Sequence, residues 1–245
     1  MKKLTTQLLI GLLVTLSCFS GKLYAQSITE TSKELSIKQQ RIIPIAAYTA
    51  IGELEQLKTA LNDGLDAGLT INEIKEAIVH LYAYCGFPRS IRGLQTFIEV
   101  LDERKAKEII DETGAEASPV NDNRSKYERG KANLETLIGR PLDGPQRGYA
   151  AFAPVIEIFL KEHLFADIFD RDILTYAERE LVTVSVLSSI GGVEPMLRSH
   201  LAICLNLGYT LEQLNEFTGI IKTTIGKKAA KNAQAVLNEV LENRE

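Results

Sequence analysis

The chain repeats itself at an offset of 140 residues, and this internal repeat restricts the possible folds more than any other feature. Turn glycines and apolar residues keep this register without a gap. The matched pairs include Gly52 and Gly192, Leu57 and Leu197, Leu61 and Leu201, Leu65 and Leu205, and Gly68 and Gly208. Leucines at helical spacing that are followed by a glycine predict a helix and the turn that ends it. We therefore expect two copies of one helical unit.

Helix signals occur throughout both copies, and strand signals are nearly absent. Thr70 to Glu73 and Thr210 to Gln213 read as capping boxes, which start helices at equivalent places in the two copies. We expect an all-α protein of two tandem helical domains, over residues 26–112 and 126–245. Residues 113–125 belong to a polar stretch rich in Asp, Glu, Asn and Ser, which predicts a linker between the domains.

The segment between the linker and the second copy carries its own pattern. Residues 127–145 are punctuated by Gly and Pro, and residues 150–169 are strongly apolar. The apolar stretch predicts one well-buried helix. Thr175 to Glu178 then predicts the cap of the next helix, which continues through Leu187.

The N-terminus has the pattern of a secretory signal peptide. Lys2 and Lys3 precede an apolar run of about a dozen residues, and Ala25 precedes a polar residue. We expect cleavage after Ala25, so that residues 1–25 are removed and the mature protein is exported to the periplasm. The alternative is a lipoprotein anchored at Cys18. No second long apolar run occurs, so we expect no membrane contact after cleavage.

The composition narrows the range of partners. The net charge of −4 offers no electrostatic basis for binding nucleic acid. No grouping of His, Asp and Glu has the spacing of metal ligands, and no phosphate-binding glycine motif occurs, so no metal or nucleotide is expected. Cys85 and Cys204 occupy non-equivalent places in the two copies, which favours two structural thiols over a disulfide.

Several motifs together resemble the carboxymuconolactone decarboxylase family, which has the alkylhydroperoxidase D-like fold. They are Gly68-Leu69-Thr70, Tyr82 to Pro88, Arg179-Glu180-Leu181, Gly191-Gly192 and Leu197 to His200. The resemblance implies an all-α homo-oligomer that acts on a small-molecule acid or lactone without a cofactor. One branch of the family decarboxylates lactones, and another uses a C-x-x-C thiol pair. Residues 191–196 stand where that pair would be and contain no cysteine, which disfavours the thiol mechanism.

The resemblance also indicates which side chains carry the chemistry. Glu180 and His200 match the acidic residue and the histidine of the family, which implies a carboxylate that orients an imidazole for proton transfer. Arg198 could bind a substrate carboxylate. The first copy has lost both reactive groups, since Gln40 aligns with Glu180 and Ala60 with His200.

The first copy keeps the tyrosines that the second copy lacks, which suggests a composite site. Tyr82 and Tyr84 would face Glu180, Arg198 and His200, or else would serve only in packing. His80 and His163 are expected to pack or to reach solvent. Three functions stay open: a lyase acting on a carboxylated lactone, a thiol antioxidant based on Cys85, and a non-catalytic binding module.

Overall fold

The computed structural model describes residues 33–244, and the expected signal peptide and Cys18 lie outside them. The described part is helical and contains no strand. The first copy comprises α1 (Ile37–Ile51), α2 (Leu54–Asp66), α3 (Ile71–His80), α4 (Tyr82–Cys85) and α5 (Phe87–Ala106). The second comprises α9 (Tyr176–Ile190), α10 (Glu194–Asn206), α11 (Leu211–Thr224) and α12 (Lys227–Glu242). The all-α tandem repeat is therefore confirmed, with α11 corresponding to α3 and α4 together.

Caps and turns form where the sequence predicts them. The side chains of Thr70, Thr175 and Thr210 accept hydrogen bonds from the backbone three residues on, each completing a capping box. Gly68 and Gly208 follow α2 and α10 with φ of 89° and 97°, a conformation that favours glycine. These local signals explain why α2 and α10 span equivalent residues and why α3 and α11 begin at equivalent residues.

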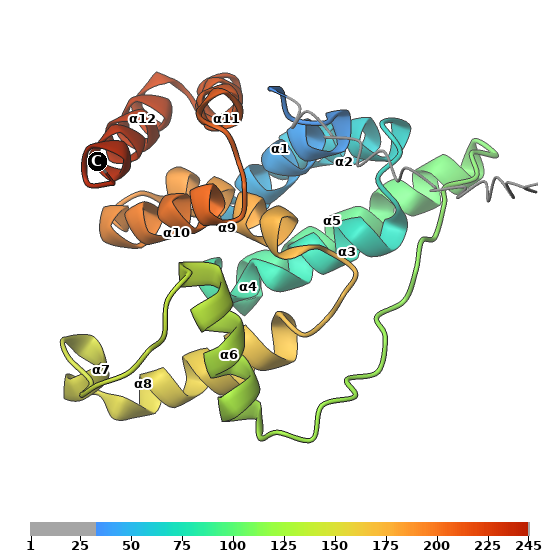
Figure 1. The fold of residues 1–245 in the computed structure, drawn as a ribbon. Helices are drawn as coiled ribbons and strands as arrows, with labels where there is room; N and C mark the ends of the chain where they lie inside the picture. The colour runs from blue at the N-terminus through green and yellow to red at the C-terminus, as the bar shows by residue number, and fades with distance from the viewer. Residues whose placement is uncertain (1–32, 245) are drawn as a thin grey trace, which may run out of the picture. The chain divides into compact units, whose positions relative to one another are not determined.

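The two copies share one hydrophobic core. α1 packs against α2 of its own copy and also against α9 and α11 of the other copy (Figure 1). Apolar residues of both copies, such as Ile43, Leu61, Val184 and Leu201, belong to this core and are fully buried. α9 is buried from Arg179 to Ser188, because neighbouring helices surround it. Each copy therefore supplies part of the other's interior.

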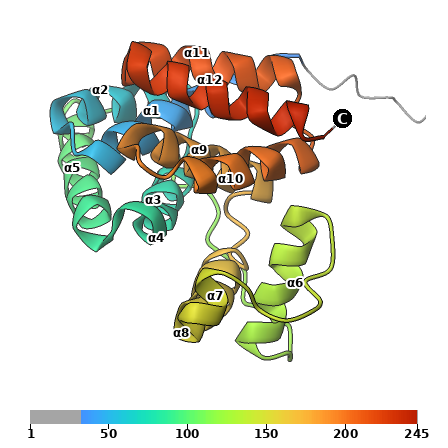
Figure 2. The same cartoon turned by 90° about the vertical axis from the view of Figure 1, so that its left-hand side faces the viewer.

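The segment between the copies forms a further helical layer. It contains α6 (Lys126–Ile138), α7 (Tyr149–Phe152), α8 (Pro154–Phe159) and the π-helix η1 (Leu160–Ile168). Figure 2 shows α6, α7 and α8 on one side of the helices of the repeats. A second apolar cluster joins this layer to α10. It comprises Leu137, Leu164, Phe165, Ile168, Phe169 and Ile203, with Tyr82 and Tyr84 packed against it.

The prediction of one well-buried helix over residues 150–169 is wrong. The helix is broken at Ala153, which has a non-helical backbone with φ of −134°. Ala153 precedes Pro154, and a proline disfavours the helical conformation in the residue before it. Phe152 is 92% exposed and Phe159 is 59% exposed, whereas Leu164 and Phe165 in η1 are buried. Apart from Ala150, only the second half of the apolar stretch therefore reaches the interior.

The polar linker is ordered against α3. The backbone N–H groups of Ile71 and Asn72 donate to the carbonyls of Glu112 and Thr113, at 2.9 Å each. The linker thus binds backbone donors that would otherwise be unpaired at the start of α3. Among residues 33–244, no helix has both the length and the apolar character that crossing a bilayer requires.

Candidate functional site

The helices α9 and α10 bring Glu180 and His200 into direct contact. Nδ1 of His200 lies 2.7 Å from Oε2 of Glu180. The Glu180 side chain is fully buried, and the His200 side chain is 13% exposed. The carboxylate binds one ring nitrogen and thereby orients the imidazole, while Nε2 has no partner among the described residues. This arrangement is suited to proton transfer at Nε2.

Tyr84 brings a side chain of the first copy to this pair. Its ring contacts the His200 ring edge-on, with centroids 5.6 Å apart. The Tyr84 hydroxyl and the second carboxylate oxygen of Glu180 are both buried and make no hydrogen bond to the described residues. Burial first, and then the Glu180 carboxylate, raise the pKa of the Tyr84 phenol. The phenol therefore stays protonated and can donate a hydrogen bond.

The other two expected substrate-binding residues lie elsewhere. The Tyr82 ring stacks on Phe87 at 4.4 Å and lies 5.7 Å from His163. Arg198 is 45% exposed and bonds Glu239 of α12, with Nε 3.0 Å from the carboxylate. The structure thus brings together Glu180, His200 and Tyr84, and it directs Tyr82 and Arg198 to different neighbours.

Both copies of the chain match the model of the carboxymuconolactone decarboxylase family, over residues 22–99 and 155–239. The chain belongs to this family. It is also similar to an uncharacterized protein of Methanocaldococcus jannaschii, at 27% identity over 74 residues. That alignment covers 30% of this chain and 69% of the relative. The name of that relative specifies no reaction.

In this family member, the thiols are not in an activating environment. Cys85 is half-buried, and its Sγ donates to the Leu81 carbonyl at 3.2 Å. Burial raises the pKa of the Cys85 thiol to about 11, although nearby Arg89 opposes the shift. Cys204 is buried, and burial raises its pKa as well. Both thiols are free and not disulfide-bonded.

A buried ionic network beside the site was missed by the sequence reasoning. Arg179 is fully buried and donates to Glu76 at 2.6 Å, and Arg171 also bonds this carboxylate at 3.0 Å. The network joins α3 of the first copy to α9 of the second. A signal was present, because Arg179 and Glu180 directly precede an uncharged helix segment, Leu181 to Ile190.

His80 lies between this network and Tyr84, so it neither reaches solvent nor simply packs. It is fully buried, and its ring centroid is 5.4 Å from that of Tyr84. Thr183 donates its hydroxyl hydrogen to the Arg179 carbonyl and so accepts from His80 Nε2, at 2.9 Å. This assigns the proton of the neutral imidazole to Nε2. Burial, Arg179 and His200 hold the pKa of His80 well below its usual value.

In the first copy, the place equivalent to the Glu180–His200 site is open to solvent. A hollow of about 370 Å³ is lined there by Gln40 and Ala60, which correspond to Glu180 and His200. Thr224 of the second copy also lines it, at the position that corresponds to Tyr84. The family scaffold thus forms this place twice, and of the two pairs of equivalent positions only Glu180 and His200 carry a carboxylate and an imidazole. In residues 33–244, no three potential metal ligands come together.

Proposed function

We propose that this member of the carboxymuconolactone decarboxylase family is a cofactor-free lyase that acts on a small carboxylated lactone or a related acid. The observation that carries the proposal is the buried hydrogen bond between Glu180 and His200, with Tyr84 against the imidazole. A carboxylate that orients a histidine is a common arrangement for acid–base chemistry. Family membership supports the class of reaction but does not specify the substrate.

The reaction follows from these groups. The bond between the substrate carboxylate and its carbon breaks, carbon dioxide leaves, and the electron pair moves into the conjugated lactone. Nε2 of His200 then donates a proton to the resulting carbanion and recovers one from water. Glu180 stabilises the positive charge on the imidazole, and the Tyr84 hydroxyl stabilises the negative charge on the lactone oxygen. Because Arg198 is bound to Glu239, its role in holding the substrate carboxylate has less support.

Paired substitutions test this function. Carbon dioxide release from carboxymuconolactone and related lactone acids would be measured for the wild type, Glu180→Gln and His200→Gln. We expect His200→Gln to lower kcat by about 10² to 10⁴, and Glu180→Gln to lower it somewhat less. The control is His163→Gln, because this imidazole is half-exposed and bonds Asp167 instead. Undiminished turnover in His200→Gln would exclude the proposed role, and no release from any lactone acid would exclude the lyase.

The two alternatives have weaker support. A thiol antioxidant based on Cys85 needs a thiolate at neutral pH, whereas burial raises the pKa of this thiol to about 11. A non-catalytic binding module would leave the Glu180–His200 pair without a purpose. Peroxide consumption that depends on Cys85 would favour the first, and ligand binding without turnover would favour the second.

We also propose, from the N-terminal sequence pattern, that the protein is exported to the periplasm. From its membership of the family, we propose that it assembles as a homo-oligomer. Fractionation of cells that express the full chain, with mass analysis of the mature N-terminus, tests the export. A mature chain that begins at Gln26 supports cleavage after Ala25, and one that begins at a lipidated Cys18 supports the anchored form.

A further inference from the structure

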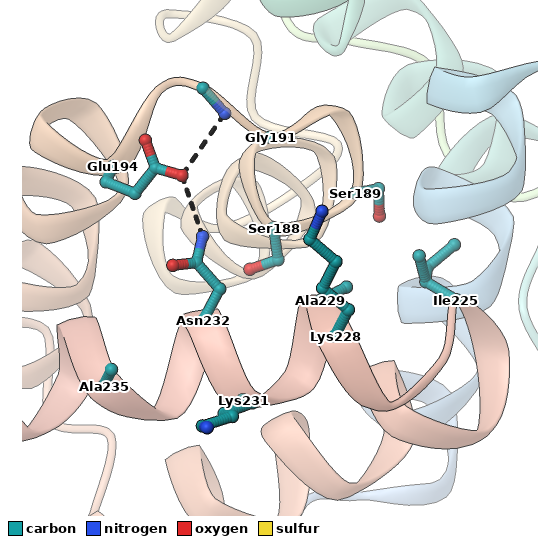
Figure 3. Close-up of a pocket in the computed structure, with 11 residues that line it drawn as sticks. Ser188, Ser189, Gly191, Glu194, Ile225, Lys228, Ala229, Lys231, Asn232 and Ala235 are labelled. Carbon is teal, nitrogen blue, oxygen red and sulfur yellow. Dashed lines mark hydrogen bonds between the residues drawn. The ribbon is translucent and has the colours of Figure 1, made fainter.

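A second hollow, of about 670 Å³, lies at the C-terminal end of α9 (Figure 3). It lies between Ser188 and Ser189 of α9, the Gly191–Gly192 turn and the first turns of α12. Its volume is within the range of small-molecule sites. Neither Glu180, His200 nor Tyr84 lines it, so it is distinct from the site of the proposed lyase reaction.

The internal repeat explains why this space is open. In the first copy, the Arg89 guanidinium lies over Gly52, so close that a Cβ added there would be 1.7 Å from Nη1. At the offset of 140 residues, Ala229 replaces Arg89 and Gly192 replaces Gly52. No atom lies within 4 Å of a Cβ added at Gly192. The hollow therefore results from a specific loss of side-chain volume in the second copy.

The side chains that face the hollow include hydrogen-bond donors without partners in residues 33–244. Ser188 is only 4% exposed, and its hydroxyl has no hydrogen-bond partner. In Figure 3 this hydroxyl points into the space between α9 and α12, and the Lys228 side chain reaches up from α12 beside Ser188. Lys228 makes no hydrogen bond or ion pair with the described residues, and α12 begins without a side-chain cap. A buried unpaired donor is costly, which indicates that a ligand completes it.

The one carboxylate at the hollow is already engaged. Oε1 of Glu194 accepts from Asn232 at 2.9 Å and from the backbone N–H of Gly192 at 3.3 Å. These bonds hold the carboxylate at the side of the hollow formed by α10 and the glycine turn. Ile225 and Ala229 supply an apolar surface next to Lys228. The hollow thus combines two lysines, Lys228 and Lys231, with a buried hydroxyl donor and an apolar wall.

We propose that this hollow binds a small organic acid. The carboxylate would lie between the Lys228 ammonium and the Ser188 hydroxyl, and the apolar part of the acid would lie against Ile225 and Ala229. A charge-assisted hydrogen bond from the ammonium and a neutral one from the hydroxyl are complementary to a carboxylate. The proposal is independent of the lyase reaction, because it involves none of the three residues of that site.

Benzoate and benzamide are suitable probes, because they have nearly the same shape and differ in charge. Each would be titrated into the mature protein, and the amide signals of Gly191 and Gly192 would be followed by NMR. We expect benzoate to give a saturable shift and benzamide to bind at least about ten-fold more weakly. Equal binding of the two probes, or no saturation by about 50 mM benzoate, overturns the proposal.

Three variants separate this site from non-specific anion binding. Lys228→Gln and Ala229→Arg should each weaken benzoate binding about ten-fold, the first by removing the ammonium and the second by filling the hollow as in the first copy. Lys227→Gln removes the same charge one residue earlier, at a position that does not line the hollow, and should leave binding unchanged. Equal losses in Lys227→Gln and Lys228→Gln would show general charge attraction and overturn the proposal. Lys228 is exposed, so its variant is expected to fold.

Discussion

Four buried polar atoms without hydrogen-bond partners among the described residues lie on or near α9. They are the Tyr84 hydroxyl, Oε1 of Glu180, the Ser188 hydroxyl and Nε of Arg179. Each such atom lowers the free energy of unfolding by about 1–3 kcal/mol, so folding alone does not account for them. The first two belong to the proposed reaction site, the third to the proposed acid-binding hollow and the fourth to the ionic network with Glu76. At the scale of single residues, unmet hydrogen bonding at three of these four atoms therefore coincides with the proposed sites.

Tyr84→Phe tests whether the Tyr84 hydroxyl serves catalysis and not folding. Because this hydroxyl has no partner, we expect the free energy of unfolding to stay constant or to rise by up to about 1 kcal/mol, while lactone turnover falls. Urea unfolding and carbon dioxide release would be measured. The matched control is Tyr176→Phe, which removes a hydroxyl that donates to Asn133 at 2.8 Å and should cost about 1 kcal/mol. A loss of stability without a loss of turnover in Tyr84→Phe would contradict this role.

His80 should make the free energy of unfolding decrease as the pH falls below about 6.5. Its pKa in the folded protein is well below the ordinary value of about 6.5, because of burial, Arg179 and His200. Above about pH 6.5 neither state binds a proton at His80, so it adds no pH dependence. Below it the unfolded chain binds a proton and the folded protein does not, so the free energy of unfolding falls by up to about 1.4 kcal/mol per pH unit.

The measurement for His80 is urea unfolding between about pH 5 and pH 7 for the wild type and His80→Gln. The variant lacks the titrating group, so its stability should fall less steeply as the pH decreases, whatever its stability at pH 7. The same slope in both proteins would show that His80 titrates alike in the folded and unfolded states.

At the scale of elements, α7 and α8 differ most from the expectation. The apolar content of residues 150–169 predicted a helix, and three short helical pieces are present. Apolar content does not show which face a neighbour covers, and large side chains of α7 and α8 stay exposed. They are Tyr149, Phe152, Val155, Ile156, Ile158 and Phe159. An exposed apolar surface of this kind is typical of an interface between subunits.

We expect the α7–α8 surface to contribute to self-association of the mature protein. Phe152→Ser and Phe159→Ser should shift the association to higher protein concentration and leave the helical content unchanged, since both side chains are exposed. Sedimentation velocity over a range of concentrations measures this shift. Ile110→Ser is the control, because Ile110 is also exposed but lies outside α7 and α8. Equal effects of all three changes would contradict a specific interface.

At the scale of the whole molecule, the two copies form one interior. α1 packs against α9 and α11, and Arg179 bonds Glu76 across the copies. The two repeats in the sequence therefore do not correspond to two separate hydrophobic cores. A shared core also places Tyr84 of one copy against His200 of the other.

Unfolding should therefore be cooperative for both copies together. Leu61 and Leu201 are equivalent by the repeat and both fully buried, so Leu61→Ala and Leu201→Ala form a matched pair. Each should lower the free energy of unfolding by about 2–5 kcal/mol and shift a single transition, seen alike by circular dichroism and by tyrosine fluorescence. Two transitions, of which each variant shifts only one, would show that the copies unfold independently.

The sequence by itself determined the helices, the capped turns, the equivalence of the copies and the candidate pair Glu180 and His200. The helices, turns and repeat follow from local spacing and from residues whose backbone preferences do not depend on distant parts of the chain. The pair follows from the resemblance of its motifs to the carboxymuconolactone decarboxylase family. Only the tertiary structure decided that Tyr84 contacts His200, that Tyr82 and Arg198 have other neighbours, and that His80 is buried beside Arg179. Such contacts depend on how α4 and α10 approach α9, and the direction of packing is not encoded in any one helix. The opening at Gly192 likewise arises between α9 and α12, where one copy lacks the arginine that fills the other.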